Sequence, residues 1–339
     1  MNVLVFTGGT GGTKLVQGLQ RIVAPEELTV VVNTGDDIEW WGLHVSPDID
    51  SVLYGLSGLL SIDRGWGVKD DTFRCLERME QLGEPAWFGL GDLDLATHLM
   101  RTGLLREGHT LTEATAELAR RMGIAARVLP MSDDRVSTML ETSKGRLSFQ
   151  EYFVRERHSV EVSRVQFVGA EQSQPAPGLL EAIASADVVV FAPSNPVTSI
   201  GPILAVPGIR EALRHAAGVV VAVSPIIGDA AVSGPAAALM RMRGWPSTIQ
   251  GVAQAYDDFL NVLVVDNSDA QAADALTGGH LRVVCTNTLM RSADDKLSLA
   301  RVVLDSSLRI QHQSGSVPFA RRREPARLDP STAKEARSG

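Results

Sequence analysis

Short apolar runs alternate with longer stretches of helical periodicity along most of the chain. The first run, residues 2–6, is followed at once by a glycine-rich segment and then by apolar residues at helical spacing between Leu15 and Ile22. A second apolar run covers residues 28–32, and strands that are buried on both faces of a parallel sheet are typically continuous runs of this kind. The N-terminal pattern therefore predicts a strand, a glycine loop, a helix and a second parallel strand.

The rest of the pattern predicts a helical insertion, a hairpin and a second group of strands. Residues 51–122 show helical periodicity, and residues 137–142 and 146–154 form an expected hairpin. Further strands are expected at 125–129, 186–191, 219–223, 262–265 and 281–284. This alternation favours an α/β fold of the Rossmann-like, doubly wound type, with a mostly parallel sheet and a single domain over 1–310. Residues 311–339 are rich in Arg, Pro and Ser, which is typical of a disordered tail.

The composition of the chain argues against several classes of protein. The 339 residues carry 32 Lys and Arg against 40 Asp and Glu, a formal net charge of −8, whereas a nucleic-acid groove needs a clustered basic surface. No apolar run approaches the roughly 20 residues that a membrane helix needs. Cys75 and Cys285 suffice for neither a disulfide framework nor a cysteine zinc site. We therefore expect a cytoplasmic protein that binds neither nucleic acid nor membrane, with both cysteines as reduced core thiols.

The glycine-rich segment between the first strand and the first helix is a candidate phosphate site. Glycines let backbone N–H groups approach phosphate oxygens, and the helix N-terminus adds a favourable dipole. The segment departs from a P-loop because no glycine precedes Lys14, and from the dinucleotide pattern because Lys14 stands where its last glycine belongs. The alternative is a glycine turn that merely packs tightly. The residues expected to bind a phosphate or nucleotide are Gly8, Gly9, Thr10, Gly11, Gly12, Thr13 and Lys14.

Acidic residues are concentrated in loops that contain glycine or proline, namely Asp36, Asp37, Asp48, Asp50, Asp92 and Asp94. Cations that assist phosphoryl chemistry are held by one or two carboxylates plus substrate oxygens, so these loops are candidate Mg²⁺ ligands. The alternative is helix capping, and Asp48 to Ser51 before an apolar helical run suits an N-cap. His98, four residues after Asp94, either faces the same crevice or is a satisfied, half-buried histidine.

A further polar group follows the strand expected at 186–191. In doubly wound sheets, ligands bind beyond the carboxyl ends of the strands. There Ser194 and Asn195 offer a hydroxyl and an amide to a sugar, base or phosphate, or else form an Asx-type turn. The sequence contains no nucleophile elbow and no zinc-ligand spacing, so nucleophilic-serine and zinc chemistry have little support.

Taken together, these loops resemble those of the 2-phospho-L-lactate transferases of coenzyme F420 biosynthesis, including their phosphoenolpyruvate-using bacterial counterparts. The resemblance runs from about Asn2 to Leu308. It is carried by Gly8-Gly9-Thr10-Gly11, Asn33-Thr34-Gly35-Asp36-Asp37, Ser46-Pro47-Asp48-Ile49-Asp50, Gly65-Trp66-Gly67 with Asp71-Thr72, Leu90-Gly91-Asp92, Leu129-Pro130-Met131-Ser132-Asp133-Asp134, Pro193-Ser194-Asn195-Pro196 with Ser199-Ile200-Gly201-Pro202-Ile203, and Ser224-Pro225-Ile226 with Ser233-Gly234-Pro235-Ala236.

The resemblance implies a Rossmann-like fold with a helical insertion, commonly assembled as a homodimer. It implies transfer of a phospholactyl, phosphoenolpyruvyl or phosphoglyceryl group from a guanosine-diphospho-linked donor to the deazaflavin 7,8-didemethyl-8-hydroxy-5-deazariboflavin (Fo), with Mg²⁺ assistance and release of GMP. By motif, the metal ligands fall on Asp36 and Asp50, and the deazaflavin contacts on Asp50 and Asp92. Asp48 or Asp50 is the expected catalytic proton acceptor. Archaeal members have a basic deazaflavin contact just before Leu-Gly-Asp, which cannot be carried over because that position here is Gly89.

Two other classes of protein stay open. A non-catalytic nucleotide or nucleotide-sugar regulator could use the same glycine loop, although it has less need of the additional acidic residues. A nicotinamide oxidoreductase is disfavoured, because Asp36 and Asp37 would have to supply the ribose ligand and Lys14 breaks the glycine pattern. Which acid is transferred depends on the shape of a pocket rather than on a motif.

Overall fold

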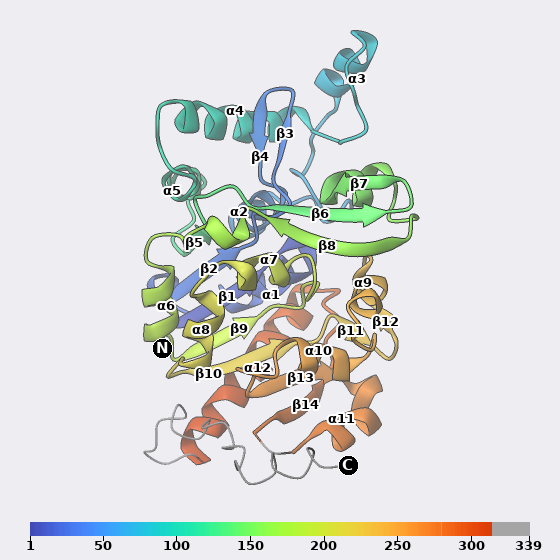
Figure 1. Ribbon diagram of the computed structural model, residues 1–339. Coiled ribbons are helices and arrows are strands. Elements are labelled where there is room, and N and C mark those ends of the chain that lie inside the picture. Colours follow the sequence, from blue (N-terminus) through green and yellow to red (C-terminus); the bar gives the residue numbers. More distant parts are fainter. Residues whose placement is uncertain (279, 314–339) are drawn as a thin grey trace, which may run out of the picture.

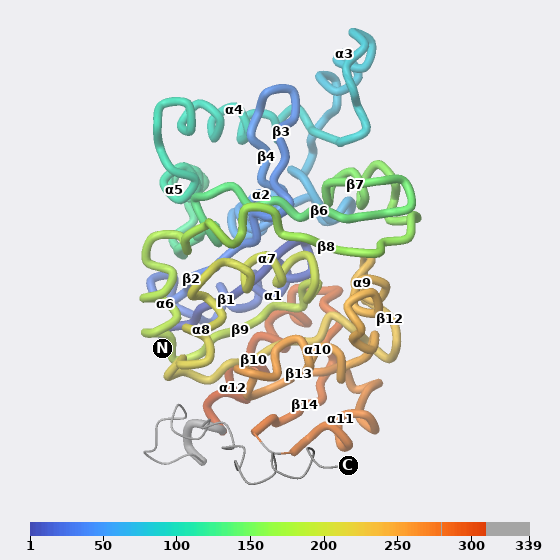
Figure 2. Tube along the Cα trace, viewed as in Figure 1, coloured from blue at the N-terminus to red at the C-terminus, as the bar shows by residue number. Residues whose placement is uncertain are grey.

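A seven-stranded sheet forms the centre of the molecule. The computed structural model describes residues 1–278 and 280–313. The strand order is β14-β13-β10-β9-β1-β2-β5, and every neighbouring pair is parallel (Figure 1). The strands are β1 (Val3–Thr7), β2 (Leu28–Val32), β5 (Arg127–Pro130), β9 (Val188–Phe191), β10 (Val219–Val223), β13 (Val262–Asp266) and β14 (Arg282–Thr286). Figure 2 shows that the sheet joins the blue N-terminal strands to yellow and orange strands far away in sequence.

Helices cover both faces of this sheet. Because side chains alternate along a strand, Val3 and Val5 of β1 pack with one helical layer and Leu4 and Phe6 with the other. The first layer contains α1 (Gly9–Leu19), α2 (Pro47–Ser57), α5 (Leu111–Arg121) and α12 (Ala293–Gln313). The second contains α6 (Leu179–Ser185), α7 (Ile200–Ala205), α8 (Ile209–Arg214), α9 (Ala236–Met242), α10 (Ile249–Ala255) and α11 (Ala270–Leu276). Two buried apolar layers therefore hold β1 in place.

Smaller elements stand beyond one end of the sheet. A hairpin of β3 (Ile38–Trp40) and β4 (Leu43–Val45) lies beside α4 (Asp92–Arg106), and α3 (Arg74–Gln81) projects farthest (Figure 1). A three-stranded antiparallel sheet contains β6 (Ser137–Thr142), β7 (Gly145–Ser148) and β8 (Val162–Val168). A two-stranded ribbon contains β11 (Ile226–Ile227) and β12 (Ala230–Ala231).

The predicted fold class is confirmed, with local differences. The hairpin expected over 137–142 and 146–154 is shorter, because a π-helical turn at Glu151–Arg155 replaces the end of its second strand, and β8 completes a sheet that sequence did not predict. The predicted helical insertion contains α2 to α5, and the expected tail at 311–339 begins within α12, which extends to Gln313. Residues 314–339 lie outside the described part of the chain.

The two cysteines differ from the expectation in their exposure. Both Cys75 and Cys285 have free thiols, but they are exposed and are not core residues as expected. Neither cysteine belongs to the two buried apolar layers, so neither contributes to the core. Among the described helices, none is both long enough and apolar enough to cross a membrane.

The contact between α1 and α12 depends on a glycine. A Cβ at Gly18 would overlap the Lys296 backbone carbonyl and lie 3.2 Å from the Ala300 Cβ. We therefore expect Gly18→Ala to lower the free energy of unfolding by about 1–3 kcal/mol, because backbone cannot move aside cheaply. The matched change Gly103→Ala, in α4 with no atom within 4 Å of the new Cβ, should raise it by about 0.5–1 kcal/mol. Urea unfolding followed by circular dichroism measures both, and equal stabilities would contradict the prediction.

Candidate functional site

A cavity lies at the point where the strand order reverses. From β1 the chain continues to β2 and β5 on one side, and from β9 it continues to β10, β13 and β14 on the other. The loops after β1 and β9 therefore diverge, which leaves the crevice that binds ligands in doubly wound sheets. A cavity of about 690 Å³ opens there, a volume within the usual range for ligand sites. Its polar wall contains residues of the glycine loop and of the loop after β9.

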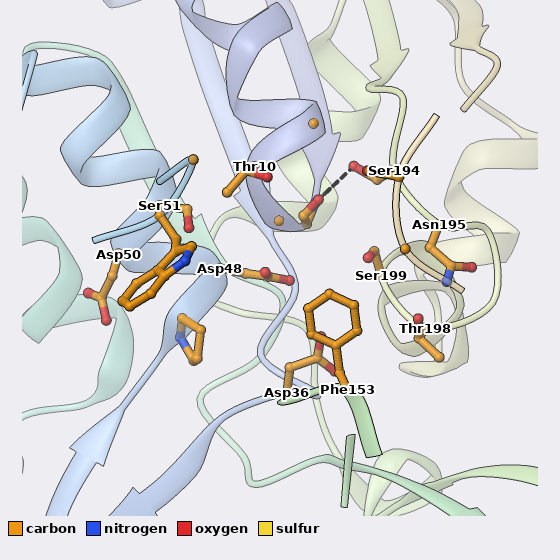
Figure 3. Close-up of a pocket in the computed structure, with 18 of the residues that line it drawn as sticks. Thr10, Asp36, Asp48, Asp50, Ser51, Phe153, Ser194, Asn195, Thr198 and Ser199 are labelled. Carbon is orange, nitrogen blue, oxygen red and sulfur yellow. Dashed lines mark hydrogen bonds between the residues drawn. The ribbon is translucent and has the colours of Figure 1, made fainter. Parts of the chain in front are cut away.

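The glycine loop is tied to the loop after β9 by one hydroxyl. The Ser194 Oγ donates to the Gly8 carbonyl at 2.8 Å and accepts from the Gly8 N–H at 3.2 Å (Figure 3). A Cβ at Gly12 would overlap the Thr7 Oγ1, so Gly12 is needed for the packing of α1 on β1. Of the segment that sequence assigned to phosphate or nucleotide binding, five residues line the cavity, namely Gly8, Gly9, Thr10, Gly11 and Lys14. Gly12 and Thr13 are buried behind it, as the tight-packing alternative requires.

Asn195 forms the turn that was its alternative interpretation. Its Oδ1 accepts the backbone N–H of Val197 at 2.9 Å, as in an Asx turn, and the residue still lines the cavity. The turn leads into a short segment in which Thr198 and Ser199 also face the cavity (Figure 3). Since Ser194 is engaged with Gly8, the free polar groups on this side of the cavity come from Asn195 and its neighbours.

Two buried aspartates, Asp36 and Asp48, meet at the centre of the cavity. Asp48 lies in the first turn of α2, where its Oδ2 accepts a hydrogen bond from Asn33 at 2.9 Å, and it does not cap α2. Its carboxylate also accepts the backbone N–H of Gly9, the first residue of α1. A Cβ at Gly8 would lie 2.7 Å from this oxygen, so the carboxylate rests directly on the glycine loop. Among the described residues, no hydrogen-bond donor reaches the Asp36 Oδ1, although the atom is buried. The Asp36 carboxylate therefore has an oxygen that no side chain or backbone donor satisfies in this part of the chain.

The electrostatics of this pair agree with its geometry. Burial, followed by the negative charge of Asp48, raises the pKa of Asp36 well above its ordinary value. Burial also raises the pKa of Asp48 to about 7, with further contributions from the charges of Asp37 and Asp50, although hydrogen bonds from Asn33 and Gly9 oppose the shift. Carboxylates with such raised pKa values are costly to ionise together unless a positive charge lies between them.

Asp50, two residues farther along α2, has a different environment. Both of its carboxylate oxygens bind the guanidinium of Arg101 from α4, which is fully buried, and the Asp50 Oδ2 lies 3.6 Å from the His98 Nδ1. Burial by itself would lower the pKa of Arg101, but the Asp50 carboxylate raises it above its ordinary value. The ligand atoms of Asp50, Asp94 and His98 lie within 4.8 Å of one another. However, Arg101 already supplies the positive charge there, so this group is unsuited to a second cation.

His98 and Asp94 complete a buried network between α2 and α4. The His98 Nε2 lies 3.2 Å from the Asp94 Oδ1, and the Tyr54 hydroxyl donates to the same oxygen at 2.6 Å. Burial would raise the pKa of Asp94, but hydrogen bonding to His98 and the charge of Arg101 hold it below its ordinary value. His98 is therefore a buried residue with a carboxylate partner that also lines the cavity.

Asp92 is not among the residues that line the cavity. Its carboxylate accepts hydrogen bonds from the Thr72 hydroxyl at 2.5 Å and the Cys75 N–H at 2.9 Å, at the start of α3. The neighbouring Asp71 accepts the N–H of Leu93 at 2.7 Å, at the start of α4, and a Cβ at Gly91 would overlap the Asp71 carboxylate. The Leu-Gly-Asp motif therefore joins two helix starts, and the deazaflavin contact of Asp92 stays a prediction.

Part of the cavity wall is aromatic. It contains Trp66, Phe88, Phe149 and Phe153, and Phe149 and Phe153 stack with ring centroids 5.5 Å apart. Phe153 lies on the π-helical turn and points into the cavity (Figure 3). A Cβ at Gly89 would lie 3.0 Å from Trp66, so the indole packs directly over Gly89. Planar apolar ligands suit such walls.

Sequence reasoning missed several residues of the site. Arg101, Asn33 and Tyr54 were not singled out, and the aromatic wall comes from segments far apart in sequence. The signal for Arg101 was present in the helical spacing, since it lies three and seven residues after His98 and Asp94, on the buried face of α4. No local pattern could have paired it with Asp50, because the two helices meet only in the fold.

The raised pKa of Asp48 predicts how stability depends on pH in the metal-free protein. The unfolded carboxyl ionises near its ordinary value of 3.8 and the folded one at about 7, so this contribution to stability is present at low pH and is lost as pH rises through 7. Asp48→Asn should therefore raise the melting temperature at pH 8 but leave it nearly unchanged at pH 4. Differential scanning fluorimetry of both proteins in EDTA checks this. A wild-type advantage at pH 8 would contradict it.

The site can now be compared with known proteins. The family model described as 2-phospho-L-lactate transferase CofD matches residues 3–288. A 2-phospho-L-lactate transferase of Methanococcoides burtonii is 45% identical over 302 residues, which cover 89% of this chain and 98% of that protein. A phosphoenolpyruvate transferase of Streptomyces griseus is 46% identical over 312 residues, covering 90% and 98%.

Solved structures add evidence on the fold alone. A crystal structure of a Bacillus halodurans protein, described as a member of the upf0052 family, aligns with a TM-score of 0.61 at 20% identity and covers 89% of this chain and 98% of its own. The family match extends over all seven strands of the central sheet, and it includes the glycine loop, Asp36, Asp48 and Asp50. The chain belongs to the 2-phospho-L-lactate transferase CofD family.

Proposed function

We propose that the protein transfers a phospho-acid group from a guanosine-diphospho-linked donor to the deazaflavin acceptor Fo, with release of GMP, in the cytoplasmic biosynthesis of coenzyme F420. The observation that carries this proposal is the position of Asp36 and Asp48, between a glycine-rich polar wall and an aromatic wall of one cavity. A diphosphate suits the first wall and a planar deazaflavin ring the second. The names of the relatives support the same reaction class.

Asp36 and Asp48 are the residues that we propose to hold Mg²⁺. Sequence placed the metal on Asp36 and Asp50, but both Asp50 oxygens are bound to Arg101, whereas Asp36 has a buried oxygen without a donor among the described residues. A hard cation prefers carboxylate oxygens and would relieve the repulsion that raises the pKa of both aspartates. When bound, the ion would neutralise charge on the donor phosphates beside a chain whose own net charge is −8.

The residues around this pair fit the steps of a phosphoryl transfer. Glycine-loop N–H groups and Lys14 bind the donor phosphates, and Asn195 and Ser199 bind the nucleotide side. The ribityl hydroxyl of the acceptor attacks the phosphorus that bears the acid, and the bond from that phosphorus to GMP breaks. The proton of the hydroxyl passes to Asp48 at the centre of the cavity, while Asp50 binds the acceptor. A hydroxyl is a poor nucleophile, so most of the rate enhancement comes from positioning and electrostatic stabilisation.

A direct assay tests the proposed reaction. Purified protein, Mg²⁺ and Fo are mixed with the guanylyl-diphospho derivative of lactate, enolpyruvate or glycerate in separate reactions, and the products are followed by mass spectrometry. We expect GMP and a phospho-acid adduct of Fo with one donor, and loss of both with EDTA. Absence of GMP and adduct with every donor would refute the transferase and favour the nucleotide-binding regulator.

Variants of the paired aspartates test the metal assignment. Asp36→Asn and Asp48→Asn should each lower turnover by ~100-fold or more, because losing a metal ligand or a proton acceptor has effects of that size. Asp274→Asn, which changes an exposed carboxylate on α11 outside the cavity, serves as the control and should keep wild-type turnover. Steady-state kinetics at several Mg²⁺ concentrations measure the effect, and wild-type turnover in Asp36→Asn would contradict the assignment.

A further inference from the structure

The most completely buried cation among the described residues is the guanidinium of Arg101. Its side chain has 0% exposure, and it is the largest of the fully buried side chains. Its Nη2 and Nη1 bind the two carboxylate oxygens of Asp50, the second at 3.2 Å, and the Nη1 also approaches the His98 Nδ1 at 3.3 Å and the His44 carbonyl at 3.5 Å. A buried arginine is costly to desolvate, so its retention beside a ligand cavity needs a reason other than stability.

The pair connects two helices at the wall of the cavity. Asp94, His98 and Arg101 lie on one face of α4 at helical spacing, and they meet Asp50 and Tyr54, four residues apart on α2. Asp50 and His98 line the cavity, whereas the Arg101 guanidinium lies behind them. Arg101 therefore acts on the cavity through Asp50 and does not itself touch a ligand.

The first turn of α2 presents two aspartates to different surroundings. Asp48 points to the glycine loop and to Asn33, and Asp50 points to Arg101. Figure 3 shows Asp50 on the far side of Asp48 from Ser199 and Asn195. A free Asp50 carboxylate would be a third anion beside the two that already repel each other. The ion pair neutralises it and fixes its direction.

We propose that Arg101 is a positioning residue, which by binding both carboxylate oxygens of Asp50 holds that aspartate at the acceptor end of the cavity and keeps it out of the metal site of Asp36 and Asp48. This inference rests on the proposed function, because it concerns the acceptor of the same reaction. In this arrangement Asp48 of α2 binds the ion and Asp50 of the same helix binds the acceptor. Arg101 is thereby a determinant of acceptor binding and not of donor or metal binding.

A purely structural ion pair makes a different prediction. Asp48 and Asp50 belong to the same turn of α2. If the ion pair served only to hold α2 in place, its loss would displace both aspartates. Binding of Mg²⁺, donor and acceptor would then weaken together. Loss of a positioning residue changes only the direction of the Asp50 side chain, so acceptor binding weakens while Mg²⁺ and donor binding stay as they are.

The test compares three variants of the full chain with wild type. Arg101→Lys keeps the positive charge but cannot make the bidentate contact with the Asp50 carboxylate. Asp50→Leu combined with Arg101→Met replaces the buried ion pair by apolar groups, which restores stability in many proteins. Arg106→Met, also on α4 but exposed and outside the cavity, is the matched control. Calorimetry measures the dissociation constants of Fo and of Mg²⁺ separately, kinetics give the KM of the donor, and thermal unfolding reports the fold.

We expect both Arg101→Lys and the double variant to bind Fo about 10-fold more weakly or worse, the loss of roughly one strong hydrogen-bonded contact, with Mg²⁺ dissociation constants within about twofold of wild type. Arg106→Met should match wild type in every measurement. Fo binding at wild-type strength in Arg101→Lys, or weakened Mg²⁺ binding in the correctly folded double variant, would overturn the inference. A wild-type protein that binds Mg²⁺ and donor but no Fo would instead refute the proposed acceptor and this inference with it.

Discussion

Close backbone approach at the end of β1 is the constraint on which the rest of the site depends. Ser194 can hydrogen-bond to the backbone of Gly8, and Asp48 can contact the glycine loop, only because Gly8 has no side chain. A Cβ at Gly8 would lie 2.7 Å from both the Asp48 Oδ2 and the Ser199 Cβ. Gly12 lets α1 pack directly against Thr7 of the strand. The divergence of the loops after β1 and β9 supplies the cavity, and these glycines bring its polar groups within reach of one another.

Charge is distributed over this cavity in two ways. Asp36 and Asp48 are buried together without a positive partner among the described residues, and Asp50 is buried with one. The first arrangement is costly as it stands, whereas the charge of the second is balanced by Arg101. Residues two apart on one helix therefore have different chemistry, because α4 supplies an arginine to only one of them. Aromatic side chains form a further part of the cavity wall.

Much of the fold was predictable, because it follows from local periodicity. Each predicted strand of the central sheet is present within two residues of the expected bounds, and apolar runs such as 219–223 specify buried parallel strands directly. The strands β3, β4 and β8 were missed, since they are partly exposed and carry no continuous apolar run. The segment 149–154 has a strand-like composition, but packing of Phe149 and Phe153 at the cavity favours a π-helical turn.

The sequence by itself determined the sheet, the glycine loop after β1 and the set of aspartates near the cavity, because these depend on residue type and on the order of neighbours along the chain. Only the tertiary structure decided the surroundings of each aspartate. Asp92 lies at a helix start, Asp50 is held by Arg101, and Asp36 meets Asp48. The physical reason is that the pKa and the free oxygens of a carboxylate depend on burial and on groups brought from distant segments, which one-dimensional spacing does not specify.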